Sequence, residues 1–401
     1  MIKRTLQELC LNITDGKHGD CENEENSGYY FISCKDIFDG QINYKNARQI
    51  TKADFEETHK RTMLEVDDIL LTNSGTIGRM AFVTDREATT KTTFQKSVAI
   101  IKPDKQKVLP RYLYYQLQNC VPQFINSSNG SAQKNLLLST MRTFRIEIEE
   151  NREKQEKIAN TLSAYDDLIE NNQKQIKLQE EAARRLYKEW FVDLRFPGHE
   201  NTKIVDGIPE GWSKSTVSEV SAVLRRGISP KYNEKARGIV INQKCIRQTI
   251  VSYDEARTQE KKYPAELEMM ESDIVICSTG AGTLGRVGQI FEAKGNATLD
   301  SHVTLIRANE KIGQQSLFWS LKMQQDYLMS AGKGSTNQLE LSRETIGSCE
   351  ILIPERKIAE QVEKNFVAIH NKMKECSMQI ARLREARDLL LPKLMSGEVE
   401  V

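Results

Sequence analysis

The sequence lacks the groupings that usually mark a metal centre or a disulfide framework. Its eight cysteines, at positions 10, 21, 34, 120, 245, 277, 349 and 376, include no C-x-x-C pair, and none of the five histidines stands at a ligand spacing beside them. Cysteines scattered in this way are typical of a reducing compartment. No apolar run approaches the length that crosses a bilayer, and residues 1–12 lack the apolar core of a signal peptide. We therefore expect a soluble, cytoplasmic protein without a metal site.

An excess of charge of one sign is also missing. The chain has 57 Lys and Arg against 56 Asp and Glu, and each of the segments 1–150, 151–195, 196–354 and 355–401 is balanced to within one charge. A nucleic-acid partner must therefore be argued from local clusters, which contact phosphate in some proteins and are only solvated faces in others. One cluster, opposed only by Glu234, contains Arg225, Arg226, Lys231, Lys235, Arg237, Lys244 and Arg247. The other, opposed by Glu87 and Asp104, contains Arg86, Lys91, Lys96, Lys102, Lys105, Lys107 and Arg111.

Proline and glycine are absent from residues 153–193, which predicts one long helix. An apolar heptad repeat runs through it. The a positions are Leu162, Ile169, Ile176, Ala183 and Trp190, and the d positions are Ile158, Tyr165, Asn172, Gln179 and Leu186.

A second stretch, residues 355–394, repeats this frame 204 positions later. Its a positions are Phe366, Met373, Ile380, Arg387 and Leu394, and its d positions are Val362, Ile369, Cys376, Leu383 and Leu390. Each helix could bury its stripe in its own globular domain. However, the first would be on the order of 60 Å long, more than a domain of ~150 residues is wide. We therefore predict an antiparallel intramolecular coiled coil that acts as a spacer, in which Asn172, Gln179 and Arg387 set the register.

The rest of the chain is duplicated as well. Residues 68–71 correspond to residues 273–276, the loop Gly75–Arg79 corresponds to Gly282–Arg286, and Gly130-Ser131 corresponds to Gly334-Ser335. Short β-rich runs and a helical stretch at residues 110–119 indicate the α+β class. We predict a domain at 1–150, a helix at 151–195, a domain at 196–354 that begins with a Pro- and Gly-rich linker at 196–211, and a helix at 355–401. Trp212 should be the first core residue after the linker.

Motifs for catalysis are missing or fail in context. Residues 280–285 fit G-x-G-x-x-G, but residues 286–291 are β-like, whereas a dinucleotide loop must open a helix. The first half has Asn73 where the first glycine should stand. The sequence contains no P-loop, no Asn-Pro-Pro tripeptide of amino-methyltransferases and no evident Ser/His/Asp grouping. We expect the chain to catalyse nothing by itself.

The duplicated Gly-Thr-x-Gly-Arg loops allow two interpretations. In the first, glycines with positive φ form the turn and the loop has no further role. Alternatively, backbone N–H groups with Thr76 or Thr283 and Arg79 or Arg286 hold DNA phosphates. The segments that contain Gln133, Lys134, Asn337 and Gln338 carry side chains that either pair with adenine or cap turns.

Taken together, these features resemble the specificity subunit of a type I restriction-modification system. The motifs that carry the resemblance are residues 186–193 (Leu-Tyr-Lys-Glu-Trp-Phe-Val-Asp), residues 209–212 (Pro-Glu-Gly-Trp), the paired loops and the paired Gly-Ser steps. The resemblance implies two target-recognition domains that read a split, asymmetric sequence in double-stranded DNA. It also implies two modification (methyltransferase) subunits docked on the helices and two restriction (motor-nuclease) subunits. S-adenosylmethionine, ATP and Mg²⁺ would belong to those partners, with no cofactor in this chain.

Base-reading residues cannot be carried over from such a family, but the repeat restricts them. What the two halves share cannot encode two different half-sites, so base reading should lie where they differ, in residues 15–27 against 225–237, 89–96 against 297–302, and after Gly130 and Gly334. The candidate DNA-binding residues are Lys17, His18, Asn73, Thr76, Arg79, Lys91, Lys96, Gln133, Lys134, Arg225, Arg226, Lys231, Lys235, Arg237, Thr283, Arg286, Asn337 and Gln338.

The candidate spacer and subunit-docking residues are Leu162, Tyr165, Ile169, Ile176, Leu186, Trp190, Phe366, Ile369, Met373, Ile380, Leu383 and Leu390. A two-domain coiled-coil scaffold that binds proteins and no DNA is the main alternative. A nicotinamide enzyme is a more distant one.

Overall fold

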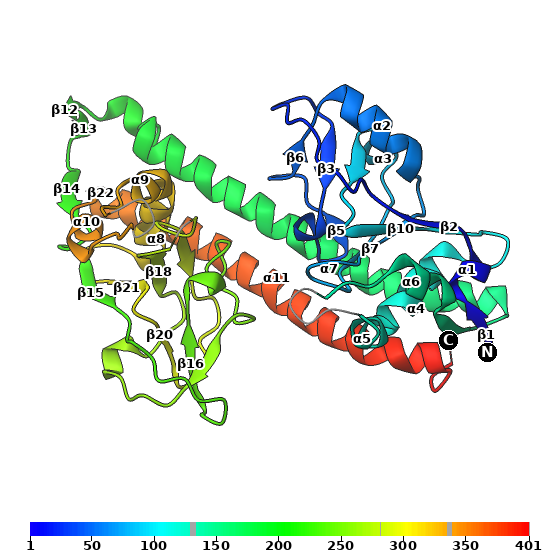
Figure 1. Ribbon diagram of the computed structural model, residues 1–401. Helices are drawn as coiled ribbons and strands as arrows, with labels where there is room; N and C mark the ends of the chain where they lie inside the picture. Colours follow the sequence, from blue (N-terminus) through cyan, green and yellow to red (C-terminus); the bar gives the residue numbers. More distant parts are fainter. Residues whose placement is uncertain (129–133, 281, 335–338, 401) are drawn as a thin grey trace. The chain divides into compact units, whose positions relative to one another are not determined.

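The computed structural model describes all residues except 129–133, 281, 335–338 and 401 (Figure 1). The chain forms two compact units, each considered by itself: unit 1 is Met1–Ile169 with Ala381–Val401, and unit 2 is Glu170–Ile380. Each unit combines one α+β domain with segments of both long helices.

Unit 1 is built on small sheets. A four-stranded antiparallel sheet has the order β2 (Cys10–Asp15), β10 (Val98–Pro103), β7 (Ile69–Thr72), β8 (Met80–Phe82). A three-stranded sheet has the order β6 (Arg48–Gln49), β3 (Tyr30–Ile32), β9 (Thr92–Phe94), with β3 and β9 parallel. The two-stranded sheets are β1 (Ile2–Thr5) with β11 (Arg145–Ile148), and β4 (Ile37–Phe38) with β5 (Gln41–Ile42).

The helices of unit 1 cover these sheets. They are α1 (Leu6–Leu9), the 3-10 helix η1 (Cys34–Asp36), α2 (Lys52–Thr62), α3 (Arg86–Thr89), α4 (Pro110–Asn119), α5 (Val121–Asn126) and α6 (Leu138–Thr143). α4 begins with Pro110 at its first turn, where the missing N–H costs nothing, and buries Tyr112, Leu113 and Tyr115. The helix predicted at residues 110–119 is thus confirmed.

Unit 2 repeats this topology. Its four-stranded sheet has the order β15 (Ser221–Arg226), β21 (Val303–Ala308), β18 (Ile274–Cys277), β19 (Val287–Gln289). Its three-stranded sheet has the order β17 (Arg257–Gln259), β16 (Gly238–Ile241), β20 (Ala297–Leu299), again with one parallel pair. β14 (Ser213–Thr216) pairs with β22 (Glu350–Ile353), as β1 pairs with β11. The remaining elements are the 3-10 helices η4 (Gln243–Cys245) and η5 (Ala265–Leu267), and the helices α8 (Gln314–Met323), α9 (Gln325–Ser330) and α10 (Arg343–Gly347).

Individual hydrogen bonds repeat as well. Thr72 N donates to Arg79 O at 2.8 Å, and Cys277 N donates to Arg286 O at 3.0 Å. Asn73 N donates to Ser97 O at 3.1 Å, and Ser278 N donates to His302 O at 2.8 Å. The predicted internal repeat is therefore confirmed, with one refinement. The ladders place Asn73 opposite Ser278, where an alignment without gaps pairs it with Gly280, because the unit 2 loop is two residues longer.

One element breaks the repeat. Between β6 and β7, unit 1 has α2, an eleven-residue helix capped by Thr51, whose hydroxyl accepts from Asp54 N at 3.3 Å. Between β17 and β18, unit 2 has only η5. The two units thus support their neighbouring loops differently.

The long helices are α7 (Arg152–Tyr187), continued by the π-helical turn η2 (Lys188–Val192), and α11 (Arg356–Ser396). None of the twenty predicted a and d positions is exposed. In unit 1, Leu162 of α7 lies in one core with Leu394 of α11, and in unit 2 Ala183 of α7 lies in one core with Phe366 of α11. Because the early part of α7 meets the late part of α11, the helices pack antiparallel, as predicted.

The segment predicted as a linker has structure of its own. Residues 196–211 contain the 3-10 helix η3 (His199–Asn201) and a two-residue hairpin, β12 (Ile204–Val205) with β13 (Ile208–Pro209). Asp206 and Gly207 form its turn, both at positive φ. Trp212 follows, 7% exposed, with its ring 4.9 Å from that of Phe196. Its prediction as a core residue is confirmed.

Candidate nucleic-acid interface

Four segments that are distant in sequence meet at one edge of unit 1. Lys17 N donates to Phe94 O at 2.8 Å, and Lys96 N donates to Lys17 O at 3.0 Å. Asn73 lies beside them through its bond to Ser97, and its own carbonyl accepts from Leu136 N at 2.8 Å. We call residues 16–18, 73–79, 95–97 and 134–136 the unit 1 loop face.

Unit 2 has the same arrangement. Ile228 N donates to Leu299 O at 2.9 Å, Ser278 N donates to His302 O at 2.8 Å, and Leu341 N donates to Ser278 O at 2.8 Å. The described residues of 227–229, 278–286, 300–302 and 339–341 form the unit 2 loop face. In each unit, the fold therefore brings together the segments in which the sequence predicts base reading.

The Gly-Thr-x-Gly-Arg loops connect β7 to β8 and β18 to β19. Gly78 has φ of 95° and Gly285 φ of 74°, and a Cβ on Gly285 would lie 2.4 Å from Met329 N. Glycine is thus required for the turn itself. A strand, β19, follows the second loop and not a helix. This agrees with the exclusion of a dinucleotide-binding loop.

The two arginines that end these loops differ in their surroundings. Arg79 is exposed, as is Thr76, and its guanidinium makes no hydrogen bond or ion pair within the described part of the chain. Arg286 is half-buried, and its Nη2 donates to Gly282 O at 2.6 Å. Thr283 Oγ1 donates to Thr279 O at 3.1 Å. The guanidinium of Arg286 is therefore bonded to its own loop, whereas that of Arg79 is not.

Lys17 is largely neutralised by α2. Its Nζ lies 3.0 Å from Asp54 and 3.1 Å from Glu57, and the hydrogen bond to Asp54 raises the pKa of Lys17. Asp54 also accepts from Glu22 N, which fixes the backbone of the same loop. Lys17 thus holds residues 15–23 against α2, and its charge is paired there.

The other unit 1 candidates have separate environments. His18 is exposed, with Nε2 3.0 Å from Asp15, and Lys91 pairs with Glu87 at 3.0 Å. Lys96 and Lys134 are exposed and make no ion pair with any described residue. The prediction that Asn73 contacts DNA is wrong, because Asn73 is only 4% exposed and lies under the loop. Its Oδ1 has no hydrogen-bond partner among the residues that the structure describes.

In unit 2, the fold supplies acidic partners that the local sequence did not show. Arg225 pairs with Glu266, Arg226 with Glu340 at 2.7 Å, and Lys231 with Glu260. Lys235 and Arg237 are exposed and make no ion pair with a described residue. Exposed ion pairs are worth only ~0–1 kcal/mol, so such cations can exchange a carboxylate for a phosphate.

The cluster at residues 86–111 contains one lysine with a structural role. Lys102, 12% exposed at its side chain, lies 2.7 Å from Asp68, and the equivalent Arg307 lies 2.6 Å from Asp273 in unit 2. Burial raises the pKa of Asp68 to about 6 and also raises that of Asp273. Because both units keep this buried pair, it belongs to the shared scaffold.

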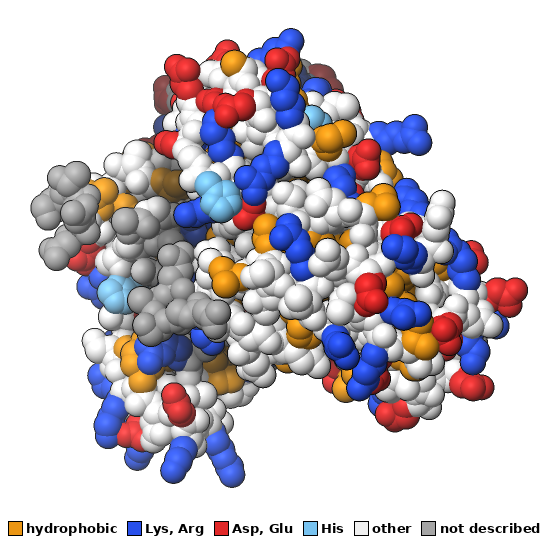
Figure 2. Space-filling model, turned by 45° about the vertical axis from the view of Figure 1, so that its right-hand side comes forward, with side chains coloured by type: hydrophobic (Ala, Val, Ile, Leu, Met, Phe, Trp, Pro, Cys, Tyr) orange, Lys and Arg blue, Asp and Glu red, His pale blue; other side chains and the backbone are white. Residues whose placement is uncertain are grey.

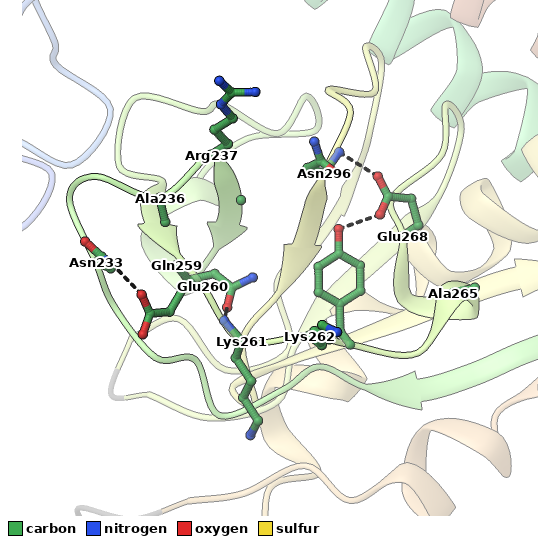
Figure 3. A pocket seen from close by; sticks show the side chains of 12 residues that line it. Asn233, Ala236, Arg237, Gln259, Glu260, Lys261, Lys262, Ala265, Glu268 and Asn296 are labelled. Carbon is green, nitrogen blue, oxygen red and sulfur yellow. Dashed lines mark hydrogen bonds between the residues drawn. The ribbon is translucent and has the colours of Figure 1, made fainter.

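A hollow of about 640 Å³ is lined by Asn233, Ala236 and Arg237 on one side and by residues between 259 and 268 on the other (Figure 3). Its acids are engaged, since Glu260 accepts from Asn233, and Glu268 accepts from Tyr263 and from Asn296 N. Arg237, Lys261 and Lys262 are its cations. The hollow therefore has a polar lining that includes three cations. On the side shown in Figure 2, Lys and Arg are interspersed with Asp and Glu, so no patch of one sign stands out.

Some candidates fall elsewhere. Gln133, Asn337 and Gln338 lie outside the described residues. The heptad residues Leu162, Trp190, Phe366 and Met373 are buried and the other docking candidates are buried or half-buried, so this stripe joins the helices to each other. Exposed apolar side chains lie elsewhere on the helices, at Leu168, Leu178, Val367 and Leu389.

Within the described ranges, no group of three or more acidic, His or Cys residues is placed to hold a metal ion. None of the helices in the same ranges is both long and apolar enough to span a membrane.

The protein thus contains two copies of one α+β module. Each copy has a polar loop face at the same place in its fold, and the two loop faces carry different side chains. Residues 3–180 match the family model described as the type I restriction modification DNA specificity domain. The chain is 28% identical over 389 residues to the type I restriction enzyme MjaIX specificity subunit of Methanocaldococcus jannaschii, covering 92% of this chain and 87% of the relative. It is 25% identical over 377 residues to the HindI specificity subunit of Haemophilus influenzae, covering 75% and 80%.

The fold has a solved counterpart in a type I restriction-modification S subunit from M. genitalium, with a TM-score of 0.57, 17% identity and coverage of 98% of this chain and 95% of that one. The resemblance that the sequence motifs predict is thereby confirmed. The chain is homologous to type I restriction enzyme specificity subunits.

Proposed function

We propose that this chain reads a bipartite, asymmetric DNA sequence, each unit recognising one half-site through its loop face. The observation that carries this proposal is the repeat. Two modules share backbone hydrogen bonds position by position, yet differ in the side chains that their loop faces expose. A shared frame with different side chains suits the recognition of two different short sequences on one repetitive backbone.

The proposal gives the shared parts a different task from the variable parts. Arg79 and Thr76, and in unit 2 Arg286 and Thr283, lie at equivalent places and would hold phosphate or support the loop. The exposed cations Lys96, Lys134, Lys235 and Arg237 would contribute to the sequence-independent part of the affinity. The buried pairs Lys102–Asp68 and Arg307–Asp273 keep the scaffold rigid beneath them.

In this proposal the chain is non-catalytic and acts in the cytoplasm. Two methyltransferase subunits would dock on the helices, and two motor-nuclease subunits would join for restriction. S-adenosylmethionine, ATP and Mg²⁺ would be bound by those partners. Because the heptad stripe faces inward, docking would use the outer helix faces that carry Leu168, Leu178, Val367 and Leu389.

Salt dependence distinguishes this function from that of a protein-binding scaffold. The full chain, purified with its methyltransferase partner, should bind duplex DNA with a log affinity that falls linearly with log salt, and polyanions should compete. Sequencing of methylated bases in cells that express both proteins should then reveal one two-part target. A complex that assembles but has neither DNA affinity nor methylated target would support the scaffold.

A further inference from the structure

Three positions of the shared frame carry different side chains in the two units. They are Gln243, Thr279 and His302 in unit 2, which we call the unit 2 triad, and Cys34, Ser74 and Ser97 in unit 1. Gln243 and Cys34 each open a 3-10 helix, η4 and η1. Thr279 and Ser74 each form an isolated bridge, with Glu340 and Asn135. His302 and Ser97 accept the equivalent backbone N–H groups of Ser278 and Asn73.

The three side chains of the unit 2 triad are linked by hydrogen bonds, with Gln243 and Thr279 half-buried and His302 exposed. Thr279 Oγ1 lies 2.6 Å from His302 Nδ1 and 3.4 Å from Gln243 Oε1. The turn beneath the imidazole is fixed, because His302 N donates at 2.9 Å to the carboxylate of Asp300, which is 3% exposed. His302 itself is exposed, and its Nε2 has no partner among the described residues. An oriented imidazole therefore presents one nitrogen outward.

A glycine allows this arrangement. Gly280 has φ of 105°, and a Cβ there would lie 2.3 Å from Thr283 Oγ1 and 2.9 Å from the amide of Gln243. The loop can approach Gln243 this closely only without a side chain at position 280.

In unit 1, the position equivalent to His302 presents little to solvent. Ser97 is 8% exposed, and its hydroxyl accepts from Cys34 N at 3.1 Å and donates to Gln95 Oε1 at 3.3 Å. Its hydrogen-bonding capacity is thus used inside the fold. One frame therefore holds an exposed imidazole in unit 2, beside the half-buried amide of Gln243, where unit 1 has a buried hydroxyl.

We propose that Gln243, Thr279 and His302 form a base-reading cluster that hydrogen-bonds a purine edge in the half-site read by unit 2. This inference rests on the proposed DNA-specificity function. A purine presents two adjacent polar atoms in the major groove, and an amide beside an imidazole nitrogen can meet both. Because unit 1 has no long side chain at these positions, its half-site is read without an equivalent contact there.

The test replaces His302 by the residue that unit 1 has at the equivalent position. The full chain with its methyltransferase partner, carrying His302→Ser, would select DNA from a library with both half-sites randomised. We expect about a tenfold loss of discrimination at one or two adjacent base pairs of one half-site, no change in the other half-site, and an unchanged salt slope. Gln243→Ala should affect the same base pairs. His199→Ser, on η3 and outside both loop faces, is the matched control.

Other outcomes separate the possibilities. Unaltered base preference in both triad variants, with thermal unfolding as in the parent, would overturn the assignment. Uniformly weaker binding with a salt slope smaller by about one would make His302 a phosphate contact and would also overturn it. If the parent itself selects no sequence, the proposed function fails before the triad is tested.

Discussion

Arg387 of α11 donates through Nη1 to Oδ1 of Asp166 on α7 at 2.7 Å, and Tyr115 of α4 donates to the other oxygen of the same carboxylate at 2.6 Å. All three belong to unit 1. Arg387 interrupts the apolar stripe of α11, and its guanidinium pairs with this carboxylate and with that of the neighbouring Asp388. The contact ties the end of α11 to both α7 and the recognition domain.

We expect Arg387→Ala to lower the free energy of unfolding by about 1–3 kcal/mol, because Asp166 would lose its charged partner in a half-buried site. Arg384→Ala, which removes a more exposed ion pair with Asp39, should cost less than about 1 kcal/mol. Urea unfolding of the two variants measures the difference. Equal effects would mean that Arg387 contributes no more than a surface charge.

The shared loop arginines should act on all DNA alike. Arg79→Ala and Arg286→Ala should each weaken binding to specific and random DNA by a similar factor and reduce the salt slope by about one. Binding isotherms at several salt concentrations provide the measurement. An altered preferred sequence in either variant would contradict a phosphate-holding or scaffolding role.

Asp68 should make stability depend on pH. Burial raises its folded pKa from 3.8 to about 6, so the folded state binds more protons than the unfolded state in this window. Its contribution is therefore most favourable below pH ~4 and declines as pH rises through about 6, by at most about 3 kcal/mol. Asp68→Asn should flatten this part of the profile of unfolding free energy against pH. An unchanged slope in the variant would assign the pH dependence to other groups.

The helices should act as a ruler between the half-sites. One heptad added to both, near Lys174 and Met378, keeps the a and d stripe and lengthens each helix by roughly 10 Å. This corresponds to about three base pairs, which turn the duplex by roughly a third of its repeat, whereas a heptad returns the helix nearly to its starting face. The variant should keep both half-sites, prefer a longer unread gap and bind more weakly. An unchanged gap with full affinity would show that the helices do not set the spacing.

Much of this architecture could be predicted because it depends on local patterns. The heptads predict two long helices, at 158–190 and at 362–394, and the first is predicted also by the absence of Gly and Pro. The duplicated Asp-Ile and Gly-Thr segments predict the repeat. The unit-specific helix α2 was missed. Its sequence, rich in charged residues and Thr, has only Phe55 and two threonines on its buried side, so it carries little apolar periodicity.

The candidate site was less accessible to sequence reasoning. The pair of Arg226 with Glu340 joins residues more than a hundred positions apart. The sequence around 225–247 therefore shows the basic side chains of this cluster but not the carboxylates that pair with them. The sequence analysis also did not predict the unit 2 triad. It included His302 in the base-reading segment 297–302, but it named neither Gln243 nor Thr279. The ungapped alignment hid it, because two extra residues in the loop after Cys277 shift Thr279 away from Ser74. The offset of 205 between the flanking strands was the available signal.

Independent reading by two modules is tested most directly by a domain exchange. Residues 212–350 would be replaced by the corresponding domain of another specificity subunit, and the chimaera, with its methyltransferase partner, would select DNA from a library with randomised half-sites. We predict that one half-site changes to that of the donor while the other stays as in the parent. Simultaneous change of both half-sites in a folded chimaera would contradict the account.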